Sequence, residues 1–335
     1  MFVLRNAQRF IPQYVRFHVK KATNSKQKSS KKKKLMMKNK LTLLIIITVA
    51  LISCEKDELD YNGEIKDGFC IVADDKVVLD HNDFEYYDYS SHLIYMKDSK
   101  SFVDDIESIG EFKIFANKKE IYTGQTVPGF HSFLLTGPII STHPSGYGDY
   151  IIPIEFIKII DTLGNVPTDL REDERIIEAL KKYNQFHAGL SCEIISVQYL
   201  SATNVSVELT LKNNDSFSYY YLDPDKMGSN LFHYFTNGLY IKDFSNHKSY
   251  THGTEHFQPE PWNSWSSDWL SIINGNESKV ITINYDSFEQ VPSGEYNATF
   301  EFPGLSYQVG KNELVQENGK IWLGEINMIK DIKIE

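Results

Sequence analysis

Residues 274–302 read NGNESKVITINYDSFEQVPSGEYNATFEF. Apolar and polar side chains alternate in two runs of this stretch, KVITINYD at 279–286 and GEYNATFEF at 294–302. Such alternation is typical of strands that bury one face and expose the other. Turn-forming residues precede each run, NGNE before the first and VPS before the second. The stretch therefore predicts two consecutive strands of an antiparallel β-domain.

Further runs of this kind occupy most of residues 191–335, and turn residues separate them at intervals typical of a sandwich. They are EIISVQY (193–199), VSVELTLKN (205–213), FSYYYLDP (217–224), GLYIKD (238–243) and KIWLGEINMIKDIKIE (320–335). We therefore expect residues 191–335 to form one antiparallel β-sandwich domain.

A polar turn, a strand and a Ser-Gly-x-Tyr corner follow one another here, the corner being Ser293-Gly294-Glu295-Tyr296. This order resembles that of bacterial immunoglobulin-like domains. The resemblance implies an Ig-like β-sandwich for residues 191–335. It implies no activity, because a fold of this kind carries many unrelated functions.

Residues 69–190 mix short strands with one helix and predict a small α+β domain, so that the whole chain is expected to be mainly β. In DYIIPIEFIKII (149–160) the interior Pro153 should lie at a sheet edge or a bulge. The period then changes, and residues 168–186 predict an amphipathic helix. Asp169 and Glu172 have the spacing of a capping box, and Gly189 is expected to end the helix.

The residues before position 55 indicate where the protein is located. Basic residues precede an apolar run of twelve residues at 41–52, too short to cross a hydrocarbon core of about 30 Å. Residues 37–53 therefore predict a cleaved signal peptide rather than an uncleaved anchor. The ending Leu51-Ile52-Ser53-Cys54 resembles the lipobox of bacterial lipoproteins. The resemblance implies that Cys54 is lipidated, with acyl chains such as palmitate.

Residues 54–68 are acidic and almost free of apolar side chains, which predicts a flexible tether. An acidic stretch after the lipidated cysteine resembles the surface-export signal of Bacteroidota lipoproteins. The resemblance implies anchoring at the outer membrane, facing the cell exterior. Residues 1–36 precede the signal and fit poorly with it, so we interpret them as an over-extended start of the gene.

Removing residues 1–54 changes the charge of the protein. Thirteen of the 35 Lys and Arg residues and none of the 45 Asp and Glu residues lie there. The mature body therefore carries 22 basic against 45 acidic residues, a formal charge of −23. Such a surface repels polyphosphates, which excludes nucleic acid as an expected partner.

Two cysteines remain after lipidation, Cys70 and Cys192. In an oxidising envelope compartment they could form a disulfide that joins the two segments. The alternative is a pair of small buried hydrophobic side chains. Asp161-Thr162-Leu163 resembles the O-glycosylation site of Bacteroidota envelope proteins, which implies a glycan on Thr162. A plain turn is the alternative there.

Histidines suggest a metal site. His252-Gly253-Thr254-Glu255-His256 matches H-x-x-E-H, the signature of inverted zincins. That chemistry needs both histidines on one helix face with Glu255 as general base, but the neighbouring residues do not favour a helix. A loop site formed by His247, His252 and His256 is a second interpretation, and exposed loop residues without a ligand are the third.

Three tryptophans lie close together in PWNSWSSDWL at 261–270. If a short helix begins at Pro261, Trp262, Trp265 and Trp269 share one stripe. An exposed stripe of this kind would stack on sugar rings. A buried stripe that covers the sandwich would have the same spacing.

These observations predict a lipid-anchored envelope protein, attached to the membrane through its lipid and without a cofactor. The first functional hypothesis is a non-catalytic surface module that binds a glycan or a protein. The second is a structural or assembly module of an envelope complex. The third is a metal-dependent hydrolase that uses His252, Glu255 and His256.

Overall fold

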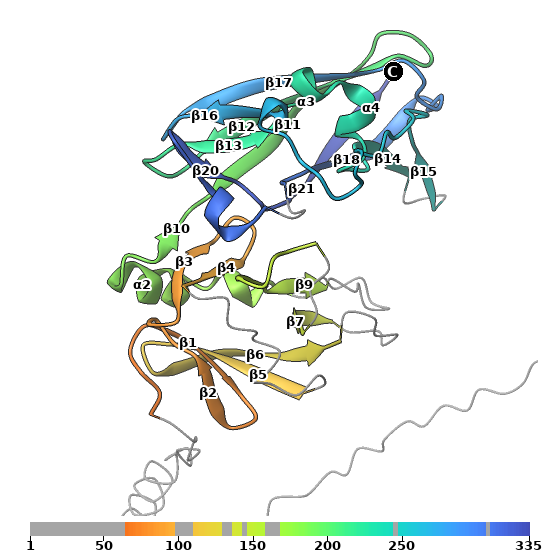
Figure 1. Cartoon of the computed structure of the whole chain (residues 1–335). Coiled ribbons are helices and arrows are strands. Elements are labelled where there is room, and N and C mark those ends of the chain that lie inside the picture. Colours follow the sequence, from red (N-terminus) through yellow and green to blue (C-terminus); the bar gives the residue numbers. More distant parts are fainter. Residues whose placement is uncertain are drawn as a thin grey trace, which may run out of the picture. The chain divides into compact units, whose positions relative to one another are not determined.

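A computed structural model describes residues 64–97, 110–128, 136–142, 146–157, 168–243, 247–305 and 309–335 (Figure 1). These residues are mainly β, and most of their strands pair antiparallel, which confirms the predicted fold class. The predictions for residues 1–36, the signal at 37–53, Cys54, most of the tether at 54–68 and Thr162 lie outside the described residues. No helix in the described part is long and apolar enough to cross a membrane.

The first half of the body contains two sheets and one helix. The six-stranded sheet has the order β2-β1-β5-β6-β7-β9, and the four-stranded sheet has the order β10-β3-β4-β8. Their strands are β1 Phe69–Ala73, β2 Lys76–Leu79, β3 Phe84–Asp88, β4 Leu93–Met96, β5 Gly110–Ala116, β6 Lys119–Val127, β7 Gly137–Ser141, β8 Ile151–Pro153, β9 Glu155–Ile157 and β10 Phe186–His187.

The predicted helix is shorter than expected. Residues Leu170–Glu172 form a separate 3-10 turn (η2), and α2 covers only Glu174–Lys182. Asp173 separates them in an extended conformation and caps α2 by accepting from the N–H of Arg175. Asn184, with a φ of +55°, turns the chain before Gly189, so that β10 follows instead of further helix.

Apolar side chains of α2 face the sheet. Ile176 and Leu180 are fully buried in one cluster with strand residues such as Phe69 and Ile114. The helix is amphipathic as predicted, although the predicted ends of the helix were wrong.

Pro153 confirms one expectation and shows how the chain changes sheet. It ends β8, which is an edge strand of the four-stranded sheet. After Ile154 the chain enters β9, the edge of the six-stranded sheet. The stretch predicted as one strand is therefore two strands in different sheets.

The second half, green to blue in Figure 1, contains three sheets, with the orders β11-β12-β17, β15-β14-β18-β21 and β16-β13-β20-β19. The strands are β11 Leu190–Tyr199, β12 Val205–Asn213, β13 Tyr219–Leu222, β14 Leu239–Asp243, β15 Lys248–Tyr250, β16 Leu270–Ile273, β17 Ser278–Tyr285, β18 Gly294–Phe302, β19 Val315–Gln316, β20 Gly319–Ile321 and β21 Ile326–Ile334. Short helical turns join them at α3 Pro224–Met227, α4 Ser229–Phe232, η3 Ser267–Trp269 and η4 Lys311–Glu313.

Alternate residues of these strands build one core. Val207 and Leu209 of β12, Ile283 of β17, and Ala298 and Phe300 of β18 are all buried in a single hydrophobic cluster. The sheet β11-β12-β17 therefore packs against the sheet of β14, β18 and β21, as in a sandwich. The predicted alternation in both runs of residues 274–302 is confirmed.

The C-terminal run at 320–335 is interrupted, against expectation. β20 ends at Ile321 and β21 begins at Ile326, in a different sheet. Gly324 lies in the break, where a Cβ atom would come within 2.4 Å of the Ser91 side chain. A side chain at this position would clash with Ser91, so glycine allows the close approach at the point where the chain crosses between sheets.

Residues on both sides of position 190 share contacts. Tyr86 and Tyr95 belong to the same hydrophobic cluster as the sandwich core. The Asp215 carboxylate accepts the N–H groups of Ala188 and Gly189, each at 2.9 Å. Residues from Asp60 onward form one compact unit.

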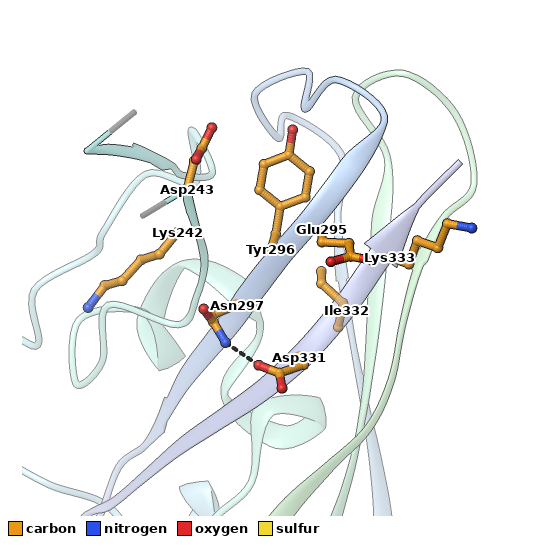
Figure 2. Close-up of a pocket in the computed structure, with 8 residues that line it drawn as sticks. All are labelled: Lys242, Asp243, Glu295, Tyr296, Asn297, Asp331, Ile332 and Lys333. Atoms are coloured by element: carbon orange, nitrogen blue, oxygen red, sulfur yellow. Dashed lines mark hydrogen bonds between the residues drawn. The ribbon is translucent and has the colours of Figure 1, made fainter. Parts of the chain in front are cut away.

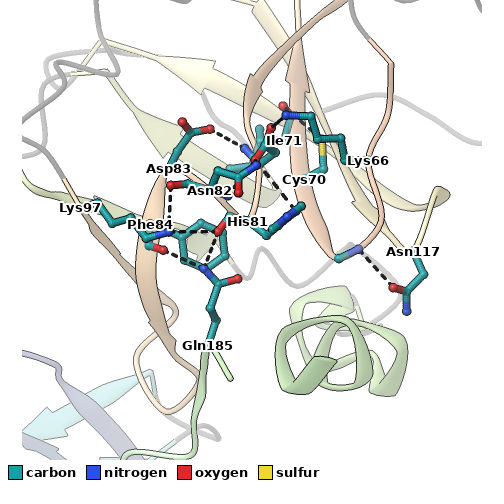
Figure 3. A network of polar contacts seen from close by, with 12 residues as sticks. Lys66, Cys70, Ile71, His81, Asn82, Asp83, Phe84, Lys97, Asn117 and Gln185 are labelled. Atoms are coloured by element: carbon teal, nitrogen blue, oxygen red, sulfur yellow. Dashed lines mark hydrogen bonds and ion pairs between the residues drawn. The ribbon is translucent and has the colours of Figure 1, made fainter. Parts of the chain in front are cut away.

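A polar network fixes the loop between β2 and β3 (Figure 3). Lys66 Nζ lies 2.6 Å from Asp80, and the Gln185 amide donates to the carbonyls of His81 and Phe84 at 2.8 and 2.7 Å. Burial alone would raise the pKa of Asp80, but the bonds from Lys66 and Asn82 hold it below its usual value. The network ties the residues after α2 to this loop.

Cys70 and Cys192 do not form a disulfide, one of the two alternatives that the sequence left open. Both are free, buried thiols that belong to different hydrophobic clusters. Burial raises the pKa of each to about 12, so both are protonated and unreactive at neutral pH. They have the second predicted role, as small hydrophobic side chains.

Candidate ligand-binding site

An open pocket of about 480 Å³ lies at one end of the sandwich. Four segments far apart in the sequence meet there: the turn between β11 and β12, α4, residues 253–255 and the end of β17 with the loop that follows it. We call it the loop-end pocket. Its hydrogen-bonding side chains come from Asn204, Ser229, Asn230, Thr254, Glu255, Asn284, Asp286 and Ser287.

Backbone hydrogen bonds hold the segment at 251–257 in place. The N–H of Gly253 donates to the Ser287 carbonyl at 2.7 Å, and the N–H of Phe257 donates to the Asn230 carbonyl at 3.0 Å. Thr251 is fixed by the side chain of Glu289, which accepts its N–H at 2.8 Å. These bonds position the irregular backbone of residues 251–257 from both sides.

The charged side chains that line the pocket are all acidic. Glu255 and Asp286 are its only charged lining residues, and no lysine or arginine lines it within the described chain. The remaining polar groups are neutral amides and hydroxyls. Such a lining can hydrogen-bond a hydroxyl-rich ligand and repels an anionic one.

Histidines pack behind the pocket, but their hydrogen bonds leave no metal site. His252 Nε2 lies 2.9 Å from the Asn237 carbonyl and must donate to it, while its Nδ1 accepts from the N–H of Thr254 at 3.3 Å. Both ring nitrogens are therefore used. No group of three His, Cys, Asp or Glu side chains among the described residues could hold a metal ion.

The H-x-x-E-H interpretation is wrong for the same segment. Residues 252–256 form no helix, and His252 instead makes an isolated bridge to Phe288. The rings of His252 and His256 lie 6.4 Å apart, and His247 lies on the turn before β15, at the other end of that strand. The predicted loop site is not assembled either.

One serine and one histidine come close at the pocket, and their geometry excludes a nucleophile–base pair. Ser229 Oγ lies 3.4 Å from His233 Nδ1. That nitrogen lies only 2.7 Å from the Ser229 carbonyl, to which it must donate its hydrogen. It therefore has no lone pair with which to take a proton from the hydroxyl.

The tryptophans do not form one exposed stripe. The segment from Pro261 is not a helix, and only Ser267–Trp269 makes a 3-10 turn. Trp265 and Trp269 pack against the sandwich core, with the Trp269 ring 5.9 Å from Phe235. Trp262 is 52% exposed. Of the three predicted ligand contacts, only Trp262 presents a large surface to solvent.

Phe257 is an exposed aromatic side chain that was not predicted as a ligand contact from the sequence. It is 56% exposed and is bonded through its N–H to Asn230, which lines the pocket. It lies between two polar residues and has no periodic partner, so no pattern singles it out. The pocket asparagines were missed because turn asparagines are common for local reasons.

A second, larger depression of about 620 Å³ lies on β14, β18 and β21 (Figure 2). Asn297 donates to Asp331 across the strands, and Glu295 lies opposite Lys333 in register. Charges of both signs thus have neighbours within the sheet itself. We interpret this surface as the solvated outer face of the sheet.

No known family model matches the chain, and no curated protein matches its sequence.

Proposed function

We propose that this protein is a non-catalytic binding module, anchored at the outer membrane through a lipid on Cys54, that binds a neutral glycan at the loop-end pocket. The observation that carries the proposal is the lining of amide and hydroxyl groups in the pocket. Two half-exposed rings follow its residues 253–255 in the chain: Phe257, whose N–H bonds to the pocket residue Asn230, and Trp262. Sugar hydroxyls both donate and accept hydrogen bonds, and sugar C–H faces stack on aromatic rings.

The envelope location rests on the sequence at residues 37–68, and a glycan ligand agrees with it because glycans surround a cell-surface protein. We also infer that the sandwich is Ig-like. The order β11-β12-β17 facing β14-β18-β21 supports this, since it matches strands A-B-E facing C-F-G of an immunoglobulin domain.

Binding is measured by calorimetry with the full chain in detergent and a panel of neutral, basic and acidic oligosaccharides. We expect the wild type to bind a neutral member and to reject the acidic members. Phe257→Ala and Trp262→Ala should each weaken binding about tenfold, or about 1.4 kcal/mol, without changing the thermal midpoint.

Ile329→Ala is the matched control, because Ile329 is 70% exposed and lies on β21, away from the pocket residues. It should bind as the wild type does. The proposal fails if no oligosaccharide binds, or if the two aromatic variants bind as tightly as the control.

A further inference from the structure

β17 is an open sheet edge. It pairs with β12 over eight consecutive residues, from Val205 opposite Tyr285 to Lys212 opposite Ser278, without a bulge. No strand in the described part of the chain pairs with its other side. Every second N–H and C=O of β17 therefore points away from the sheet.

Other long edges of the sandwich are protected. β11 has a bulge between Ile194 and Ser196 and contacts β21. β21 carries charged side chains, among them Lys330 and Asp331. In a constant-type immunoglobulin sandwich a fourth strand covers the edge that corresponds to β17, but β16 pairs with β13 in another sheet.

Lys279 is the single protective charge on β17, and the outward side chains of the strand carry none. They are uncharged and exposed, with Val280 62% exposed. Lys279, at the start of the strand, points inward and donates to the Ile272 carbonyl at 2.5 Å. Beyond it no charge, proline or bulge interrupts the edge. The outward residues are Ser278, Val280, Thr282 and Asn284.

We propose that two copies of the chain pair through β17, antiparallel about a two-fold axis, and form a continuous six-stranded sheet. An antiparallel edge is self-complementary, because each copy offers the same alternation of donors and acceptors. The body carries a charge of −23, so most surfaces of two copies repel one another. The outward side chains of β17 are uncharged, so pairing through this strand places no like charges opposite one another.

Pairing has a consequence for binding. Asn284 and Asp286, at the end of β17, line the loop-end pocket. In an antiparallel pair the two strand ends lie about 25 Å apart. A dimer would therefore present two pockets on one sheet, although the pairing itself does not depend on what the pockets bind.

Cysteine cross-linking in native membranes tests the pairing with the full chain. Thr282→Cys places a thiol on the edge, whereas Cys70 and Cys192 are 0% and 7% exposed and should not react. A short bismaleimide should give a band at twice the mass of the chain. Ile329→Cys, on the other sheet, is the matched control and should give only the band at the mass of a single chain, because its thiol lies away from the paired edge.

Adding Val280→Lys to Thr282→Cys should remove the doubled band, because two lysines would then lie close together across the axis. Sedimentation of the purified wild-type chain should show a dimer, and the Val280→Lys variant should shift to monomer by at least tenfold in dissociation constant. A monomeric wild type overturns the proposal. A cross-linked band of another mass overturns it too, because a different protein would then occupy the edge.

Discussion

Three contacts fix the state of the His233 ring. Its Nδ1 donates to the Ser229 carbonyl, and its Nε2 lies 3.2 Å from the Tyr285 hydroxyl. That hydroxyl accepts the N–H of Leu239 at 3.0 Å and is free to donate to Nε2. These contacts fit a neutral ring. Burial lowers its pKa to about 4, the bond to the Ser229 carbonyl opposes this shift, and the neighbouring His252 and His256 add smaller lowering contributions.

His233 should make the fold sensitive to acid. In the unfolded chain this ring has its ordinary pKa of 6.5. Above pH 6.5 the ring is neutral in both the folded and the unfolded state, so the free energy of unfolding does not depend on its protonation. As the pH falls from 6.5 to about 4, the unfolded state binds the proton first and stability is lost. His233→Asn, which keeps a donor for the Ser229 carbonyl, should lose less stability in this window. Thermal midpoints between pH 4 and 7.5 measure it, and identical slopes for the two proteins would contradict the prediction.

The tryptophans show the limit of residue-level prediction. Their spacing is compatible with an exposed platform and with a buried cover, and the structure divides them between the two. Trp269 packs on Phe235, while Trp262 is half exposed. Spacing could not decide this, because the stripe exists only if the segment is helical, and it is not.

At the level of elements, α2 depends on Asp173, the N-cap residue that precedes it. Asp173 accepts the N–H of Arg175 at 2.9 Å and satisfies one of the unpaired donors of the helix. Its carboxylate also binds the Arg175 guanidinium at 2.6 and 2.8 Å, and these bonds lower the pKa of Asp173 to about 2. The cap is thus present over the whole neutral range.

Asp173→Ala should lower the free energy of unfolding by about 1 kcal/mol, because the first turn of α2 loses its cap. Asp173→Asn should keep most of the stability, since asparagine caps as well as aspartate does. Urea denaturation followed by far-UV circular dichroism measures both. Equal stability of the alanine variant and the wild type would show that the cap contributes nothing.

The strands themselves were easier to predict than the strands with which they pair. β12, β17 and β18 were found from alternation, because each buries one face and exposes the other. The crossings between sheets at Ile154 and Gly324 were missed, since neither changes the local pattern of apolar residues. Sheet membership depends on contacts that lie far away in the sequence.

The site was the least predictable part of the whole molecule. The loop-end pocket joins residues around positions 204, 230, 254 and 286, and no local motif connects them. The one motif that was found, at 252–256, contributes Glu255 to the pocket but not the metal chemistry that its letters suggest. Only the fold brings these segments together.

The two halves of the body should unfold together rather than as separate domains. Tyr86 and Tyr95 pack in the sandwich core, and the Tyr150 hydroxyl donates to the Val309 carbonyl at 2.6 Å. The Lys320 ammonium lies 4.0 Å from the centre of the Tyr86 ring. Contacts of this kind across residue 190 couple the stability of one half to that of the other.

Leu180→Ala tests this coupling. Leu180 is fully buried on α2, and the truncation should cost about 3 kcal/mol through lost contacts and a cavity. All four tryptophans lie in the second half, so their fluorescence reports on the sandwich alone. In urea we expect the fluorescence midpoint to fall by the same amount as the far-UV midpoint, whereas Ile329→Ala should shift neither. If the far-UV midpoint falls and the fluorescence midpoint does not, the halves are independent domains joined at residue 190.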